Sequence, residues 1–118
     1  MVPATRTYKT GDIIIEQGEP AMEAYLIMAG SADVVVENSG KKAVIASIGE
    51  GDIFGESALF KGSDYGASIV ARTEMEVQPI PPDILDEKIR HCDPMIRALI
   101  RMMMIRLRRT TLAAAGQD

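Results

Sequence analysis

Short runs of β-forming residues, each followed by turn-forming residues, fill the chain between Gly11 and Val77. They recur about every eight to twelve positions and read DIII, AYLIM, ADVVVE, AVIASI, ASIVA and MEVQPI. This spacing predicts an all-β sandwich or barrel, because strands so short bury a core only by packing together. The segment ENSGKK is typical of a hairpin turn, in which we expect Asn38 and Gly40 to adopt left-handed backbone conformations.

Helical spacing begins after the segment PIPP. We expect Asp83 to cap a short helix over about residues 83–91. Asp93 should cap a longer helix over about residues 94–113, because Pro94 at its first position loses no hydrogen bond. A chain of 118 residues is long enough for one domain with a real core. The sequence therefore predicts a single, mainly β domain over residues 1–118 that ends in two helices.

The longer predicted helix is apolar on more than one side. One stripe at helical spacing consists of Ile96, Leu99, Ile100, Met103 and Leu107. Met102 and Ile105 lie outside this stripe, and Arg97, Arg101 and Arg108 fall on another face. Such a helix packs against two surfaces of its own domain or meets a partner helix. We expect a homodimer through this helix, and a monomer is the alternative.

Charge is unevenly distributed along the chain. Residues 1–83 carry 6 basic and 13 acidic side chains, net −7, whereas residues 84–118 carry 7 basic and 4 acidic ones, net +3. An acidic body argues against nucleic-acid binding, which needs a positive face. No apolar run approaches the roughly 20 residues of a membrane span. The single Cys92 and the lack of an apolar leader favour a reducing, cytoplasmic location.

Catalytic chemistry finds little support in the residues. A jelly roll that holds a catalytic metal uses two or three histidines, but His91 is the only histidine and lies in the helical segment. Cys92 has no second thiol with which to share a metal. No serine stands in a Gly-x-Ser-x-Gly elbow. We predict no catalytic residues, no metal site and no enzymatic activity.

The segment FGESALF has the composition of a phosphate cradle. Gly55 lets the backbone approach a ligand, and ESAL can begin a short helical turn whose N–H groups face an anion. The Glu56 carboxylate would repel a phosphate but can accept a hydrogen bond from a neighbouring sugar hydroxyl. The alternative is an ordinary turn that Glu56 merely caps.

With these residues in view, the chain from residue 8 to about residue 109 resembles the cyclic nucleotide-binding domain. This family includes bacterial catabolite activator proteins, regulatory subunits of cAMP-dependent protein kinase and cyclic nucleotide-gated channels. The matched positions are Gly11, Gly18, Tyr25, Ile27 and Gly30, and IGEGDIFGESAL matches the approach to the family's phosphate-binding cassette. The resemblance implies a β-roll (a double-stranded β-helix or jelly roll) over about residues 8–81, followed by the two helices.

The resemblance also implies roles for individual residues. Gly55 would contact the ligand near the ribose, and Glu56 would hold the ribose 2′-hydroxyl. Ser57 and Ala58 would offer backbone N–H groups to the cyclic phosphate. Ser68 falls where the family has a Thr or Ser that touches the purine in members that accept cGMP.

One departure from the family pattern affects ligand binding. Where the family has Pro-Arg, with the arginine paired to the phosphate, this chain has Asp64 and Tyr65. Lys61 is the only cation of the loop and could swing in as a point-charge substitute for the arginine, but it is more simply a solvated surface lysine. Tyr65 could hydrogen-bond a neutral ligand or plug the pocket with its ring.

The sequence therefore predicts a regulatory or sensory module with weak or altered binding of a cyclic purine nucleotide, cAMP or cGMP, and with no other cofactor. The alternative is a degenerate, ligand-free module that acts through protein contacts or dimerisation. No helix-turn-helix follows the long helix, so DNA binding through this chain is not expected. An effector domain would lie outside these residues.

Overall fold

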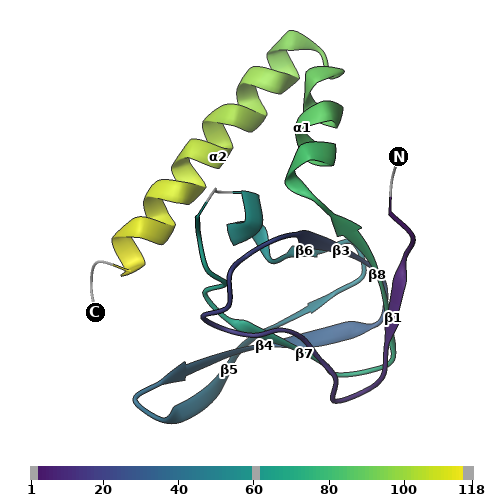
Figure 1. Ribbon diagram of the computed structural model, residues 1–118, viewed down its shortest axis with the longest axis vertical. Coiled ribbons are helices and arrows are strands. Elements are labelled where there is room, and N and C mark those ends of the chain that lie inside the picture. Colours follow the sequence, from purple (N-terminus) through teal and green to yellow (C-terminus); the bar gives the residue numbers. More distant parts are fainter. Residues whose placement is uncertain (1–2, 60–61, 116–118) are drawn as a thin grey trace. The chain divides into compact units, whose positions relative to one another are not determined.

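The computed structural model describes residues 3–59 and 62–115, with side chains as far as Arg106. The chain forms two compact units, one ending at Pro82 and one beginning at Asp83. Figure 1 shows the strands of the first unit curling into a roll and two helices making up the second. The predicted fold, a mainly β domain followed by two helices, is confirmed.

Two antiparallel sheets of four strands each build the first unit. The first sheet has the order β1 (Arg6–Tyr8), β8 (Met75–Ile80), β3 (Ala24–Ala29) and β6 (Ile53–Phe54). The second has the order β2 (Ile13–Ile15), β7 (Ser68–Ala71), β4 (Ser31–Asn38) and β5 (Lys41–Gly49). Apart from the β4–β5 hairpin, neighbours in each sheet come from distant parts of the chain. The roll brings the β2–β3 loop beside the segment before β7, where Pro20 and Asp64 form a bridge.

The core of the roll lies between the inner faces of the two sheets. Alternation along the strands buries Ile69 and Ala71 of β7 and Met75 and Val77 of β8. The rings of Tyr25 and Phe54 stack with centroids 5.1 Å apart. The full cluster of buried side chains consists of Ile15, Tyr25, Ile27, Ala32, Phe54, Tyr65, Ile69, Ala71, Met75 and Val77. Tyr65, a predicted ligand residue, is thus part of the core.

The β4–β5 hairpin differs from the predicted turn in one residue. Ser39 and Gly40 have positive φ angles of 54° and 79°, whereas Asn38 stays in β4 and pairs with Lys41. The prediction for Asn38 was wrong, because a two-residue turn places the left-handed pair one position later. The prediction for Gly40 is confirmed.

Two of the strands were not predicted from the sequence. Strands β1 and β6 have three and two residues, too few to show an alternating pattern. Both pair at the edges of the first sheet, where contacts with distant strands define them.

Helix α1 spans Pro82–Arg90 and α2 spans Pro94–Ala115, close to the predicted bounds. The Asp93 carboxylate accepts a hydrogen bond from the Met95 N–H at 2.8 Å, which confirms Asp93 as the cap of α2. On α2, the predicted stripe residues Ile96, Leu99 and Met103 are exposed in the single chain. The side chains of Leu107 and Arg108, also named in the sequence pattern, lie outside the described residues.

Gly30 lies between β3 and β4 and is the position where the roll tolerates a side chain least. Its φ is +90°, and a β-carbon there would overlap the Glu74 carbonyl oxygen and crowd Met75. Gly11 has the same φ, but its α-carbon faces open space. Substituting each of the two glycines therefore distinguishes the energetic cost of backbone strain from that of steric overlap.

We predict that Gly30→Ala lowers the free energy of unfolding by about 3 kcal/mol or more, since strain and overlap add. The matched Gly11→Ala should cost only about 1 to 2 kcal/mol, from strain alone. Urea unfolding followed by circular dichroism measures both. Equal losses would show that the close approach of Glu74 has no energetic effect.

Candidate functional site

Within the segment FGESALF, which we predicted to form a phosphate cradle, residues 54–59 fold as the end of a strand followed by a short helical turn. Strand β6 ends at Phe54, and the 3₁₀ helix η1 spans Glu56–Leu59, so the expected short helical turn is confirmed. Gly55 joins them with a φ of +75°. The Ala58 N–H donates to the Gly55 carbonyl at 3.1 Å and closes the turn. That N–H is therefore engaged within the chain, unlike the expectation that Ala58 offers it to a phosphate.

Gly55 is enclosed by its own chain. A β-carbon at this position would lie 3.3 Å from the Glu23 carbonyl oxygen, 3.3 Å from Cε1 of Tyr65 and 3.5 Å from Cα of Ala24. A larger residue would push the Tyr65 ring or the start of β3 away. Glycine is thus required here by intramolecular packing, whether or not a ligand approaches.

Glu56 and Ser57 form the accessible part of the cradle. The Glu56 side chain is exposed, and Ser57 is half-buried. Among the residues that the structure describes, the Glu56 carboxylate has no hydrogen-bond partner. It is therefore available to accept a bond from a hydroxyl group of a ligand.

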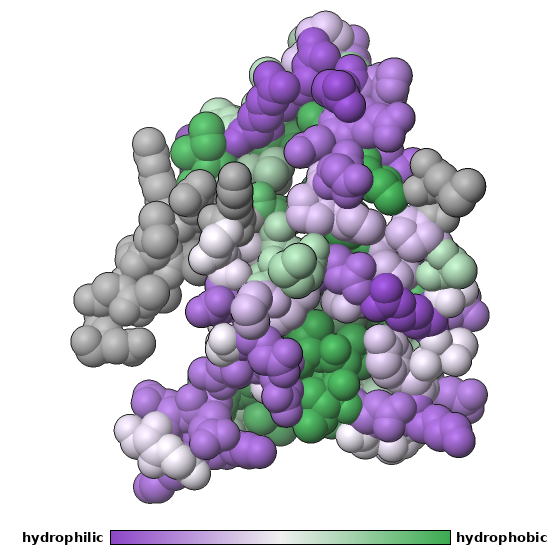
Figure 2. All heavy atoms as spheres, viewed as in Figure 1, coloured by the Kyte–Doolittle hydropathy of each residue, from purple (hydrophilic) through white to green (hydrophobic). Residues whose placement is uncertain are grey.

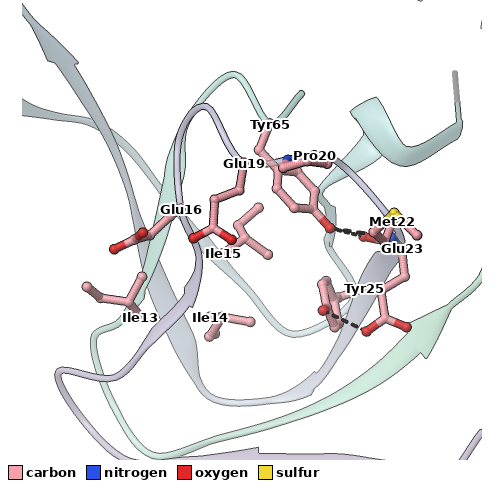
Figure 3. A pocket seen from close by; sticks show the side chains of 10 residues that line it. All are labelled: Ile13, Ile14, Ile15, Glu16, Glu19, Pro20, Met22, Glu23, Tyr25 and Tyr65. Carbon is pink, nitrogen blue, oxygen red and sulfur yellow. Dashed lines mark hydrogen bonds between the residues drawn. The ribbon is translucent and has the colours of Figure 1, made fainter. Parts of the chain in front are cut away.

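Tyr65 is the residue that the resemblance implies in place of the family's phosphate-pairing arginine. Only 8% of the residue is exposed. Its hydroxyl donates to the Glu23 carbonyl at 2.6 Å and accepts from the Glu23 N–H at 3.4 Å (Figure 3). The phenol is thus held by the β2–β3 loop, and its ring lies beside Gly55.

We define the cassette as residues 54–71. A short ladder of backbone hydrogen bonds joins the β2–β3 loop to the second half of this cassette. The Gly18 N–H donates to the Tyr65 carbonyl at 2.8 Å, and the Tyr65 N–H donates to the Glu19 carbonyl at 2.9 Å. The Ala21 N–H donates to the Ser63 carbonyl at 3.0 Å. Asp64 forms an isolated bridge with Pro20 within this ladder, and its side chain is exposed.

Ser68 faces a different environment. Ile69 is buried in the core, so the alternation of β7 places Ser68 on the opposite face of the sheet. The Ser68 hydroxyl accepts a hydrogen bond from the Gln17 N–H at 2.9 Å. It lines a groove of about 710 Å³, whose floor includes Ile13, Val35 and Val70. The structure does not bring Ser68 together with the cradle, and its contact with a purine stays a prediction.

Apolar side chains are exposed over the region of β2, β4 and β7, between hydrophilic lobes, in Figure 2. The carboxamide of Gln17 crosses one end of the groove. It donates to the Glu37 carbonyl at 3.1 Å and accepts from the Glu37 N–H at 2.7 Å. The Gln17 side chain thus pairs with β4 as a neighbouring strand would.

A second cavity, of about 320 Å³, lies on the Tyr65 side of the roll (Figure 3). Tyr25 and Tyr65 line it together with three carboxylates, those of Glu16, Glu19 and Glu23. The neighbouring Glu16 carboxyl, chiefly through a side-chain hydrogen bond, raises the pKa of Glu19. Such a lining opposes binding of a phosphate at this cavity.

Glu23 was not identified from the sequence, yet it contacts several parts of the site. Its carboxylate accepts from Arg6 at 2.6 Å and from the Tyr25 hydroxyl at 2.8 Å, while its backbone holds Tyr65. No local motif marks it, because its partners lie up to 42 residues away. Burial, and then the bond to Glu23, raises the pKa of Tyr25 well above its ordinary value.

Lys61, the one cation that the sequence offered as a substitute clamp, lies outside the described residues. In the part of the chain that is described, no three His, Cys, Asp or Glu side chains are grouped as metal ligands would be. None of the described helices is long and apolar enough to span a bilayer.

The family model described as "Cyclic nucleotide-binding domain" matches residues 5–92. The cAMP-dependent protein kinase regulatory subunit of Dictyostelium discoideum is 41% identical over 71 residues, 59% of this chain and 22% of that subunit. The cGMP-bound form of the EAL enzyme Bd1971 aligns with a TM-score of 0.74 and 26% identity, over 97% of this chain and 31% of that one. The catabolite activator protein of Thermus thermophilus aligns with a TM-score of 0.75 and 25% identity, over 97% of this chain and 54% of that one. The chain spans about a fifth of the length of the curated relatives it matches.

The raised pKa of Tyr25 predicts a pH effect on stability. The folded chain keeps this proton longer than the unfolded chain, so the contribution is fully present below about pH 10 and is lost as the pH rises towards the folded-state pKa. The free energy of unfolding should therefore fall more steeply between about pH 9 and pH 11 in the natural sequence than in Tyr25→Phe. Urea unfolding at several pH values tests this, and equal slopes would contradict it.

Proposed function

Because the chain belongs to the cyclic nucleotide-binding domain family, we propose that it is a regulatory module that binds a cyclic purine nucleotide weakly or in an altered way. The observation that carries the proposal is Tyr65: it stands where the family places its arginine, and its hydroxyl is bonded to the Glu23 backbone. The resemblance inferred from the sequence is confirmed by the family model. The strength of binding is the new element.

The expected weakening follows from the missing positive charge. A charge-assisted hydrogen bond to a desolvated phosphate contributes roughly 1.5 to 3 kcal/mol. Its absence should weaken binding by about tenfold to a hundredfold. Asp64, exposed beside Tyr65, adds negative charge to the same segment.

The rest of the cradle supports residual recognition of a ribose. Glu56 is exposed and has no partner among the described residues, and Ser57 is accessible beside it. We name cAMP and cGMP as the ligands to test. A relative with 41% identity is a cAMP-dependent kinase regulatory subunit, and a structural neighbour is described as cGMP bound.

A regulatory role without catalysis is supported by the curated relatives, which are regulatory subunits of a protein kinase. The effector would be a separate protein or a segment outside these residues, since the chain covers about a fifth of its curated relatives. We place the module in the cytoplasm, where the free Cys92 would stay reduced.

Restoring the arginine tests the proposal. Tyr65→Arg should tighten cAMP binding about tenfold or more in calorimetric titration at low salt, because it supplies the missing charged partner. Tyr65→Met removes the same hydroxyl without adding charge and should give no gain. In the Tyr65→Arg background, Glu56→Ala should abolish the gain by removing the acceptor of the ribose hydroxyl. If none of these proteins binds either nucleotide while circular dichroism shows an intact fold, the proposal fails.

A second candidate function is dimerisation or protein contact through α2. Met102 and Ile105 leave 44% and 55% of their surface exposed in the single chain. Burying a Met or Ile stabilises by roughly 1.5 to 3 kcal/mol, and a two-fold contact counts each side chain twice. A weak homodimer is therefore within reach.

We predict that Met102→Glu combined with Ile105→Glu converts a concentration-dependent dimer into a folded monomer. Sedimentation equilibrium over a range of concentrations measures this, and circular dichroism checks the fold. Arg101→Glu, also exposed on α2, serves as a control for the introduced charge. A natural domain that stays monomeric at the highest concentration would rule out this dimer.

A further inference from the structure

We propose that Tyr65 is an internal latch that holds the cassette in its folded conformation without any ligand. The latch is the bond from the Tyr65 hydroxyl to the Glu23 carbonyl at 2.6 Å, which crosses from the cassette to the start of β3. It acts in the ligand-free chain, so it does not depend on whether a nucleotide binds.

The latch satisfies backbone groups that would otherwise lack partners. The Tyr65 hydroxyl both donates to the Glu23 carbonyl and accepts from the Glu23 N–H. The regular pairing of β3 begins one residue later, at Ala24. A partly buried backbone group without a hydrogen bond is costly, so the chain strongly favours the conformation in which the phenol is inserted.

Packing supports the same conformation. Gly55 brings η1 close to the latch, with Cε1 of Tyr65 and the Glu23 carbonyl oxygen each 3.3 Å from the position of a missing β-carbon. The ring is buried with the core cluster that includes Ile15 and Tyr25. Gly55 in the first half of the cassette and Tyr65 in the second half therefore lie side by side, at the Tyr65 ring.

The backbone ladder extends the effect along the loop. Three amides, those of Gly18, Ala21 and Tyr65, bridge the β2–β3 loop and the cassette. These three hydrogen bonds lie on either side of the latch. Loss of the latch should therefore loosen the pairing between the β2–β3 loop and the cassette. A charged arginine at the same position could donate to the Glu23 carbonyl but could not accept from the Glu23 N–H, so it would make only one of the two bonds.

The latch affects how much a bound nucleotide can order this part of the chain. Tyr65 and the backbone ladder already hold residues 63–65 in the ligand-free chain, so a nucleotide has little order to add to this segment. A ligand without differential affinity for two conformations shifts neither. The latch therefore limits the conformational change that a weakly bound nucleotide can produce in this segment.

Amide hydrogen exchange of the ligand-free domain, followed by NMR, tests the latch with Tyr65→Phe, which keeps the ring and removes the hydroxyl. Exchange of the amides at positions 18, 21 and 65 should accelerate about tenfold, as expected for one lost buried hydrogen bond. The amides of Ile27 and Gly51, which bond to Asp52 and Ile27 elsewhere in the roll, should change less than about twofold.

The matched control is Tyr25→Phe. It removes a hydroxyl that bonds to the carboxylate of Glu23 and leaves the carbonyl contact of Tyr65 intact. This variant should leave the three bridging amides within about twofold of the natural domain. Unchanged exchange in Tyr65→Phe, or equal acceleration of all amides in both variants, would overturn the latch. Because no nucleotide is present, such a result leaves the proposed binding function to be judged by titration alone.

Discussion

The hydrogen bond between the Tyr65 hydroxyl and the Glu23 carbonyl connects segments 42 residues apart at the point where the cassette meets the first sheet. Gly55 must remain a glycine because this pair occupies the space beside its α-carbon. The backbone ladder of the β2–β3 loop runs along the same contact. The geometry of the cradle is therefore set by an interaction within the protein, in a family whose cassette is otherwise built around an arginine and a phosphate.

The charges around Tyr65 also argue against a cradle that is organised by a bound phosphate. The cavity beside Tyr65 is lined by Glu16, Glu19 and Glu23, and Asp64 is exposed next to the ring. Arg6, at the edge of the sheet, pairs with Glu23 and faces no described phosphate site. With no arginine in the cassette, a bound phosphate would depend on η1 and on dipoles of the backbone. The weak binding that we propose would follow from this charge distribution.

Much of this fold could be predicted from the sequence, because short β-forming runs separated by turn-forming residues mark successive strands. Strands β1 and β6 are too short for such a signal, and the left-handed residue of the hairpin was placed at Asn38 when the turn uses Ser39. The short helical turn after Phe54 and the lack of an arginine between residues 54 and 71 were also evident from the sequence. The hydrogen-bond partner of the Tyr65 hydroxyl could not be predicted, because the acceptor is a main-chain carbonyl and carries no residue-specific signal. For the same reason the hydrogen bond from the Gln17 N–H to the Ser68 hydroxyl could not be predicted.

The most direct test of this account is the exchange rate of the Tyr65 amide in the natural domain, measured by NMR without nucleotide and again with saturating cAMP. The account predicts a slowly exchanging amide in the free domain, with a change of less than about twofold when cAMP is added. An amide that exchanges rapidly in the free domain and becomes protected only with cAMP would contradict it. In that case the nucleotide, and not Tyr65, would order the cassette.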